Sequence, residues 1–365
     1  MIQIKHITDY LESIAPLSLQ ESYDNSGLIT GNPEWEVKGV MVCLDSTEGV
    51  IQDAIRNMCN LVIAHHPIIF SGLKKLTGSN YVERTIITAI KNDIAIYAVH
   101  TNLDNVLVGV NKMICEKLGL VNLKILSPKK NALKKLVTFC PGEHAEKVRT
   151  ALYQAGAGSI GNYDECSFNV EGKGMFRGNE LTNPFVGEAR TRHVENEIRI
   201  EMIFEGYRQS EIIKSLNEAH PYEEVAFDIY SLENKWQEAG SGMIGELADS
   251  QSEGDFLKEV KRIMKAGCIR HTSFTGNKIS KVAVCGGSGS FLLSNAIQAG
   301  AQLFITADFK YHQFFDADGQ ILIADIGHFE SEQYTMEGIK TLILKKFSTF
   351  AVRISEVNTN PVHYI

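Results

Sequence analysis

Residues 61–70 read Leu-Val-Ile-Ala-His65-His66-Pro67-Ile-Ile-Phe, and the rest of the fold can be worked out from them. Four apolar residues predict a buried strand, and Pro67 prevents the two histidines from continuing as a helix. Ligands of open α/β sheets bind beyond the carboxyl ends of the strands. Neighbouring residues of an extended chain point to opposite sides, so His65 and His66 can each reach a different metal ion. A turn with two solvated histidines is the alternative that this stretch alone leaves open.

Length and composition indicate a globular protein of two domains. The 365 residues exceed what one hydrophobic core usually supports. Hydrophobic residues make up 44% and charged residues 22%, which is ordinary for globular proteins. The N-terminus lacks the basic-then-apolar layout of a signal peptide, and no apolar run is long enough to span a bilayer. We therefore expect a cytoplasmic protein without membrane contact.

Cysteine usage and net charge argue against other classes of protein. The seven cysteines are scattered and form no Cys-x-x-Cys pair, which argues against a disulfide framework and a thiolate zinc cluster. A net charge of −8 disfavours nucleic-acid binding, because that affinity comes mainly from clustered Lys and Arg. A local basic channel for nucleic acid is an alternative that net charge does not exclude.

The first 130 residues alternate strands and helices. This alternation predicts parallel pairing with right-handed crossovers, so His65, His66 and Asp104 are expected at one edge of one sheet. Residues 21–31, which include Asp24 and Asn25, are expected as a polar loop that is either a turn or a site loop. The expected strands cover residues 37–44, 61–64 and 94–99, and the expected helices cover residues 4–15, 50–58, 85–91 and 111–118.

A different pattern occupies residues 131–235. Its order is strand, helix, two strands, helix and strand, which is the ferredoxin-like order. We expect it as a domain inserted into a core of residues 1–130 and 236–365. The glycine-rich segment 156–161 is either a structural turn or an anion site, and residues 220–224 (His-Pro-Tyr-Glu-Glu) either end a helix or form a weak metal site. The structural alternative is favoured for both.

The α/β pattern of the core resumes after Trp236, and we expect the core to be a mostly parallel sheet flanked by helices. Residues 286–290 (Gly-Gly-Ser-Gly-Ser) join a strand to a helix. They are either a tight turn or a contact for a phosphate or substrate at the helix N-terminus. The expected strands cover residues 281–285, 303–307, 320–325 and 352–357.

Candidate metal ligands follow four of the expected strands. Clustered histidines and carboxylates are costly without a partner, and a metal ion supplies one. Nitrogen and oxygen ligands suit zinc, manganese or iron. His328 and Glu332 lie four residues apart and therefore on one helix face, whereas Glu330 projects away. The candidates are His65, His66, Asp104, Asp308, His312, His328 and Glu332.

These residues predict a site for two ions. A carboxylate such as Glu332 can bridge ions about 3.5–4 Å apart, as in two-metal hydrolases. His65 and His66 would divide between the ions, Asp104 would complete the first, and His328 the second. His100 and His312 are candidates for carrying protons or orienting ligands, since a histidine titrates near neutral pH.

Five motifs of the sequence resemble those of the NIF-three-like family, whose members are often called GTP cyclohydrolase 1 type 2 homologues. The resemblance covers about residues 2–130 and 236–365. The motifs are Ala64-His-His-Pro, His100-Thr-Asn-Leu-Asp104-Asn105, Tyr23-Asp24-Asn25-x-Gly27, Cys285-Gly-Gly-Ser-Gly and Gly327-His328-x-x-x-Glu332.

The resemblance carries expectations about site and assembly. It implies two divalent ions per chain, zinc foremost and manganese or iron as alternatives, held by His65, His66, Asp104, His328 and Glu332. It also implies a toroidal homohexamer whose metal sites face an inner cavity. The inserted segment, with Cys140-Pro-x-x-His144, resembles the PII/CutA-like domain of longer bacterial members.

Three functions from different classes are considered. The leading hypothesis is a metal-dependent hydrolase of a nucleotide-like or other small heterocyclic substrate, with ring opening of GTP as the candidate that the resemblance names. A metal-activated water would attack, and His312 or His100 would move the proton. The second is a metal-binding regulatory or chaperone protein whose inserted domain senses a ligand. A nucleic-acid-binding ring comes third, disfavoured by charge.

Overall fold

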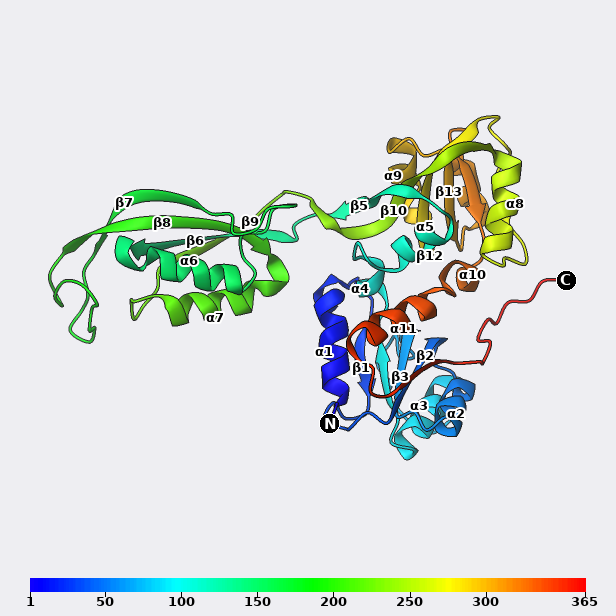
Figure 1. Cartoon of the computed structure of the whole chain (residues 1–365), viewed down its shortest axis with the longest axis horizontal. Coiled ribbons are helices and arrows are strands. Elements are labelled where there is room, and N and C mark those ends of the chain that lie inside the picture. The colour runs from blue at the N-terminus through cyan, green and yellow to red at the C-terminus, as the bar shows by residue number, and fades with distance from the viewer. The chain divides into compact units, whose positions relative to one another are not determined.

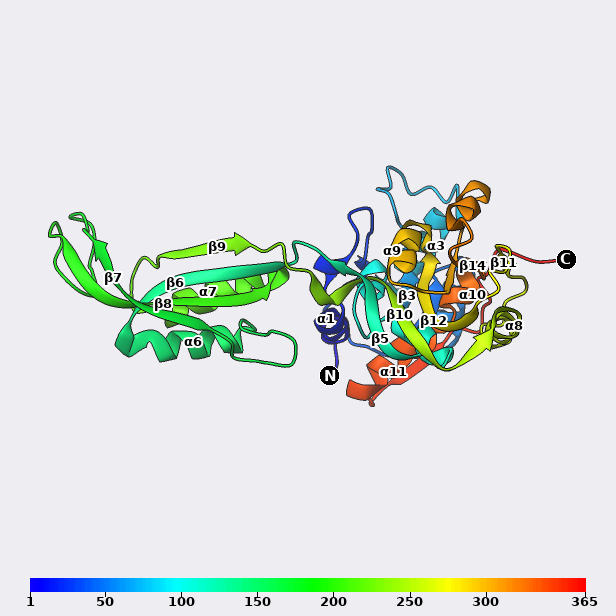
Figure 2. The ribbon, with the colours of Figure 1, turned by 90° about the horizontal axis from the view of Figure 1, so that it is seen from above.

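A computed structural model describes all residues, 1–365, and divides the chain into two compact units. The first unit combines Met1–Pro128 with Gln237–Ile365, and the second unit is Lys129–Trp236. Figures 1 and 2 show the ribbon from two directions. None of the helices combines the length and apolar character that crossing a bilayer requires.

The first unit contains a five-stranded sheet built from the two ends of the chain. Strands β2, β3, β4 and β15 pair in parallel, and β1 pairs antiparallel with β4 at one edge. Helices α2 and α3 pack on one face over a core that includes Met41, Val62 and Ile96, and α11 contacts β2 and β15. The strands, in spatial order, are β1 (Gly27–Thr30), β4 (Ala95–Ala98), β3 (Leu61–His66), β2 (Gly39–Asp45) and β15 (Ala351–Ile354), and the helices are α1 (Ile4–Ile14), α2 (Glu48–Arg56), α3 (Tyr81–Lys91) and α11 (Thr335–Lys346).

A second, six-stranded sheet completes this unit. Its centre, β12, β13 and β14, is parallel, whereas β10 pairs antiparallel with β12 and β11 pairs antiparallel with β14. Helices α5, α8 and α10 contact β12. The strands, in spatial order, are β11 (Arg270–His271), β14 (Leu322–Asp325), β13 (Leu303–Ala307), β12 (Lys278–Ser288), β10 (Trp236–Ser252) and β5 (Val121–Lys129), and the helices are α5 (Val110–Lys117), α8 (Glu253–Ile263), α9 (Leu293–Gln298) and α10 (His328–Glu332).

The core has two sheets where one mostly parallel sheet was expected, and the expected parallel pairing holds within β2, β3, β4 and β15 and within β12, β13 and β14. Strand–helix alternation indicates parallel pairing within each run of elements, but it does not tell whether two runs join edge to edge. Three further strands were missed. Residues 27–30, expected as loop, form β1, residues 121–129 form β5, and residues 270–271 form the short β11.

The second unit has the predicted ferredoxin-like order. A four-stranded antiparallel sheet has the spatial order β7-β8-β6-β9. Residues of α6 and α7, such as Val148 and Leu216, share a hydrophobic core with the sheet. The elements are β6 (Leu133–Pro141), α6 (Ala145–Gln154), β7 (Phe168–Phe176), β8 (His193–Glu205), α7 (Gln209–Ala219) and β9 (Phe227–Ser231).

Residues 156–161 and 220–224, for which the sequence left two alternatives each, have structural roles in the second unit. His220 Nε2 contacts the carbonyl oxygen of Phe139 at 2.9 Å, and its Nδ1 accepts the backbone N–H of Tyr222. Both ring nitrogens are therefore used within the fold. The N–H groups of Gly156 and Gly158 donate to backbone carbonyls, so they are not free to bind an anion.

Local sequence explains where the helices that border the sheets begin. Thr47, Asn80 and Ser252 each accept a backbone N–H with the side chain and so cap α2, α3 and α8. Strands β2 and β3 are buried almost throughout, as expected of parallel strands covered on both faces. Their register sets Asp45 opposite His66 at the carboxyl ends.

Candidate metal centre

Three elements bring the predicted ligands together within the first unit. His65 and His66 are the last residues of β3. Asp104 ends the short helix α4 (Thr101–Asp104), which follows β4. His328 and Glu332 lie one turn apart on α10, which follows β14. In Figure 1, α4 and α10 lie between the two sheets of this unit, so the two sheets contribute ligands to one centre.

Glu332 divides the cluster into two halves. Its Oε2 lies 3.0 Å from His66 Nε2 and 3.2 Å from His328 Nε2, and those two nitrogens are 3.4 Å apart. Its Oε1 lies 3.8 Å from His65 Nε2, which is 3.6 Å from Asp104 Oδ1. One carboxylate thus presents an oxygen to each pair of predicted ligands.

Two buried atoms of the cluster lack a hydrogen-bond partner. They are His65 Nε2 and Asp104 Oδ1, and their separation of 3.6 Å is too long for a hydrogen bond. Buried polar atoms are nearly always satisfied, so this pair is chemically incomplete. An imidazole nitrogen and a carboxylate oxygen suit a borderline divalent ion, and the residues present therefore fit a metal ion.

Each histidine is oriented through its other ring nitrogen. Nδ1 of His65 contacts the carbonyl oxygen of Val99 at 2.9 Å, and Nδ1 of His66 contacts Asp45 Oδ1 at 2.8 Å. Nδ1 of His328 contacts Asp308 Oδ2 at 2.7 Å. Because these oxygens only accept, Nδ1 carries the proton, and in the neutral ring Nε2 keeps its lone pair. This is the usual arrangement around metal-ligating histidines.

The interpretation of the sequence missed Asp45. It stands at the carboxyl end of β2, and that position was the signal that identified the other candidates. Asp24 was considered only as part of a turn or site loop. Its carboxylate contacts His100 Nδ1 at 2.7 Å and accepts the Thr101 N–H, so the loop belongs to the site.

The cluster is strongly charged in the absence of metal. Burial opposes the charged form of His66, but hydrogen bonds to Asp45 and Glu332 outweigh it and raise the pKa of His66 to about 9. Burial is likewise outweighed at His328, where Asp308 and Glu332 raise the pKa to about 11. Despite its burial, Glu332 has a pKa well below the usual range because the histidines donate to it. Protons thus occupy the positions that a cation would fill.

Asp104 behaves differently. Burial and the charge of Glu332 raise the pKa of Asp104 to about 7. Two carboxylates in one buried site disfavour each other's ionisation. A divalent cation between them would remove that conflict.

The two proton-carrier candidates lie in different places. Ligand atoms of His65, His66 and His100 all lie within 4.8 Å of one another, as do those of His66, His328 and Glu332. His100 therefore belongs to the cluster. His312 is exposed, its ring faces Phe315, and it borders neither of the two cavities that His66 and His328 line.

A cavity of about 330 Å³ opens onto the cluster. Tyr23, Phe70 and Phe291 line it with rings that are more than half exposed. No Lys or Arg lines it. The turn at residues 286–290 borders it too, but Gly286 N donates to Asn111 Oδ1 and Gly287 N to Ser331 Oγ, so these two N–H groups are not free for a phosphate.

The architecture defines a two-sheet α/β protein with a histidine- and carboxylate-lined centre and an inserted ferredoxin-like domain. The sequence model of the Duf34/NIF3 (NGG1p interacting factor 3) family matches residues 2–361, and the chain belongs to that family.

Relatives agree over the full length. A "GTP cyclohydrolase 1 type 2 homolog" of Halalkalibacterium halodurans is 38% identical over 98% of each chain, and one of Bacillus subtilis is 36% identical over 99% of this chain and 98% of its own. The crystal structure of a Bacillus cereus protein related to NIF3 covers 100% of this chain and 99% of its own at 37% identity, with a TM-score of 0.85.

Proposed function

We propose that this protein is a dinuclear metal-dependent hydrolase of a small heterocyclic, nucleotide-like substrate. The observation that carries the proposal is the unsatisfied buried pair His65 Nε2 and Asp104 Oδ1, beside a Glu332 that offers its other oxygen to His66 and His328. Buried polar atoms are nearly always hydrogen-bonded. Buried atoms that lack a partner where several strands end are therefore typical of a site that binds a ligand.

The donor set divides naturally between two ions. His65, Asp104 and Glu332 Oε1 would hold one, and His66, His328 and Glu332 Oε2 the other. Zinc, manganese and iron all accept such ligands, with zinc foremost. When bound, two such ions activate a water and stabilise the attacking and leaving oxygens of a hydrolysis.

His100 is the residue we assign to proton movement. Asp24 holds its Nδ1 at 2.7 Å, which leaves Nε2 as the free nitrogen of the neutral ring, and the side chain lines the cavity. Burial of Asp24 is outweighed by hydrogen bonds from His100 and Thr101, which hold its pKa below the usual range. An ionised Asp24 accepts from His100 Nδ1 and keeps the ring oriented toward the cavity.

The cavity supports a planar substrate. Three exposed rings, Tyr23, Phe70 and Phe291, border it, and exposed aromatic rings commonly bind flat heterocycles by stacking. The absence of Lys and Arg from its lining leaves the phosphates of GTP without a basic partner there. GTP is the substrate suggested by the relatives' name, and the cavity favours its base over its triphosphate.

Turnover by metal-loaded protein tests the proposal. GTP, guanosine and other purine nucleosides would be incubated with protein carrying two ions per chain, and ring-opened or deaminated products measured by mass spectrometry. We expect a hydrolysis product from at least one substrate, lost in both Glu332→Gln and His100→Gln. Failure to hydrolyse any member of the panel would contradict the proposal.

A metal-binding regulatory or chaperone protein is the second candidate, and a cavity of about 750 Å³ in the second unit favours it. Removal of residues 131–235 separates the two functions. A hydrolase keeps its turnover without the insert, whereas a sensor keeps its metal and loses its response to a ligand.

A further inference from the structure

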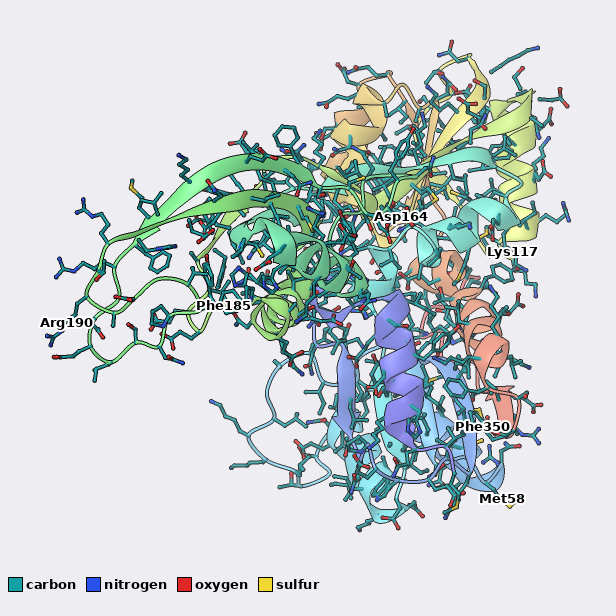
Figure 3. All side chains as sticks on the ribbon, turned by 60° about the vertical axis from the view of Figure 1, so that its left-hand side comes forward. Met58, Lys117, Asp164, Phe185, Arg190 and Phe350 are labelled. Atoms are coloured by element: carbon teal, nitrogen blue, oxygen red, sulfur yellow. The ribbon has the colours of Figure 1, made fainter.

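A cavity of the second unit has the dimensions of a small-molecule site. Its volume of about 750 Å³ lies within the usual range for ligand pockets. Strands β7 and β8, the loop between them and the segment that precedes β9 enclose it. Phe185 lies on that loop, as does Arg190 (Figure 3).

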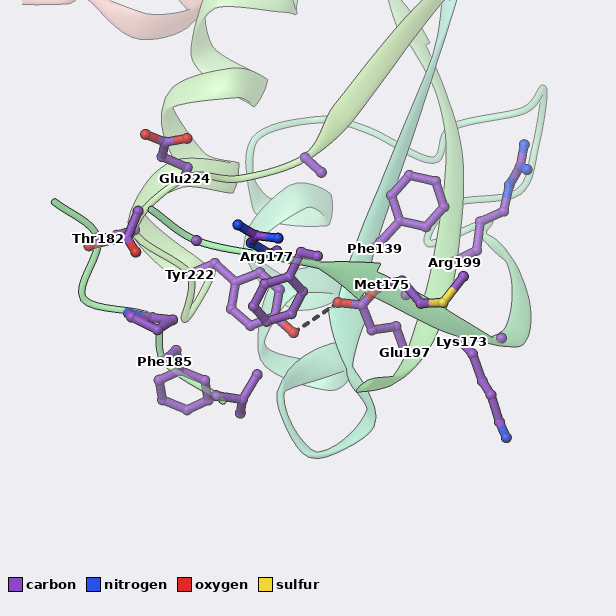
Figure 4. A pocket seen from close by; sticks show the side chains of 18 of the residues that line it. Phe139, Lys173, Met175, Arg177, Thr182, Phe185, Glu197, Arg199, Tyr222 and Glu224 are labelled. Atoms are coloured by element: carbon purple, nitrogen blue, oxygen red, sulfur yellow. Dashed lines mark hydrogen bonds between the residues drawn. The ribbon is translucent and has the colours of Figure 1, made fainter. Parts of the chain in front are cut away.

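A buried carboxylate lies in the wall of this cavity. Glu197 is only 9% exposed, and its Oε1 accepts the hydroxyl proton of Tyr222 at 2.8 Å (Figure 4). Strand β7 carries a glycine beside it. A Cβ on Gly174 would overlap Glu197 Oε2, so glycine at this position leaves room for the carboxylate.

No cation compensates the charge of Glu197. None of the ion pairs of the chain includes it, and its one side-chain partner is a neutral phenol. Burial and the hydrogen bond to Glu197 raise the pKa of Tyr222 above its usual range, so the phenol remains the donor and Glu197 the acceptor. A buried carboxylate with one neutral partner is suited to a further donor that carries positive charge.

Aromatic rings surround this acceptor. The ring of Tyr222 lies 6.2 Å from those of Phe176 and Phe185, measured between centroids. Phe139 and Met175 line the cavity as well. Phe185 is 48% exposed although it is apolar, and such an aromatic surface is where a flat ring or a cation is bound.

The three cations that line the cavity, Lys173, Arg177 and Arg199, are all exposed. Lys173 and Arg199 direct their charged ends away from the pair of Tyr222 and Glu197 in Figure 4, and Arg199 is already paired with Glu201. Arg177 lines the cavity together with the acids Glu223 and Glu224. The one charged group that is both buried and turned to the aromatic walls is the carboxylate of Glu197.

We propose that this cavity binds a small aromatic or heteroaromatic cation. Its ring contacts Phe176, Tyr222 and Phe185, and its protonated nitrogen donates to Glu197. This site is independent of the metal centre of the first unit, and it gives the insert a ligand of its own.

Two probes with the same ring and opposite charge test this site. Tryptamine carries an ammonium group on an indole, whereas indole-3-propionate carries a carboxylate. Titration calorimetry of the full chain is expected to give saturable binding of tryptamine and none of indole-3-propionate. Equal binding of both, or of neither, would overturn the proposal.

Variants locate the binding. Glu197→Gln keeps the acceptor for Tyr222 but removes the charge, and we expect tryptamine affinity to fall at least about tenfold. Phe185 lies on a loop and is half exposed, so Phe185→Ala is expected to fold normally. We expect its affinity for tryptamine to fall about fivefold. Phe168→Ala removes another exposed ring, on β7 and outside this cavity, and should leave affinity unchanged. Unaltered affinity in both Glu197→Gln and Phe185→Ala would refute the site.

Discussion

At the scale of single residues, the centre depends on acceptors that hold the ring nitrogens. Asp45 contacts His66 Nδ1 and also accepts the Thr359 hydroxyl at 2.6 Å, Asp308 contacts His328, and the Val99 carbonyl contacts His65. Each acceptor lies at or just beyond the end of a strand. The strand ends therefore supply both the ligands and the groups that orient them, which is why the five predicted ligands can meet with defined orientations.

Asp45→Asn tests the orienting role. The amide of asparagine can present its NH2 group to His66 Nδ1, which favours the wrong tautomer of the ring. Mutating a residue that hydrogen-bonds a metal-ligating histidine typically lowers metal affinity about 10- to 100-fold. We expect a loss of that size in competition with a chelator, with folding unchanged by circular dichroism. Asp249→Asn, at an exposed position of β10, serves as the control. Equal metal affinity in both variants would show that Asp45 has no such role.

The pKa shifts predict how the metal-free protein responds to pH. The pKa values of His66 and His328 are raised in the folded chain to about 9 and about 11, above the roughly 6.5 of an unfolded histidine. Their stabilising contribution is thus complete below about pH 6.5 and is lost as the pH rises through the folded values. With a chelator present, the melting temperature should fall between pH 7 and 10 more steeply for wild type than for His66→Gln. Identical slopes would contradict this assignment.

At the scale of elements, glycines let β12 approach the helix that carries two ligands. Gly287 has φ +60°, and a Cβ there would overlap Glu332 Oε1 and lie 3.1 Å from His328 Cε1. Gly319 has a similar φ of +67° with open space around its Cβ position. Both positions have a positive φ, which is unfavourable for any L residue, and they differ in what surrounds the Cβ position.

Alanine at each glycine separates strain from crowding. Both Gly287→Ala and Gly319→Ala should lose about 1 kcal/mol of stability or somewhat more, because L residues are strained at positive φ. Only Gly287→Ala should also lose metal, since it displaces Glu332. The checks are denaturant unfolding and elemental analysis of the two purified variants. Full metal content in Gly287→Ala would show that β12 does not constrain the carboxylate.

The elements also show what a sequence can predict here. The alternation of strands and helices around residues 37–66 predicted parallel strands. The four-residue spacing of His328 and Glu332 after Gly327 predicted that both lie on one face of a helix. Both rest on local periodicity. The separation into two sheets and the pairing of β1 with β4 depend on contacts between distant segments, which periodicity does not encode. Asp45 was overlooked although it stands at the carboxyl end of a strand, and only the register of β2 and β3 shows that it lies opposite His66.

At the scale of the whole molecule, the insert enters and leaves through neighbouring strands. The second unit begins at Lys129, the last residue of β5, and ends at Trp236, the first residue of β10. These two strands are neighbours in the second sheet, so a short turn can replace the insert without altering the core.

Excision of the insert is therefore expected to leave a folded core. A chain with residues 131–235 replaced by a short Asn-Gly turn should unfold cooperatively and retain its metal, and it should lose the binding of tryptamine. A shortened chain that folds but binds no metal would show that the metal site depends on the insert.

The hexamer implied by the family resemblance stays a prediction. If it is right, light scattering should give six times the mass of one chain.

Elemental analysis of the purified wild-type protein tests the central claim most directly. After exposure to zinc, manganese or iron and exhaustive dialysis, we expect two divalent ions per chain, both lost in Glu332→Ala and one lost in His65→Ala. Wild-type protein that retains no stoichiometric ion, or Glu332→Ala protein that retains both, would contradict the account.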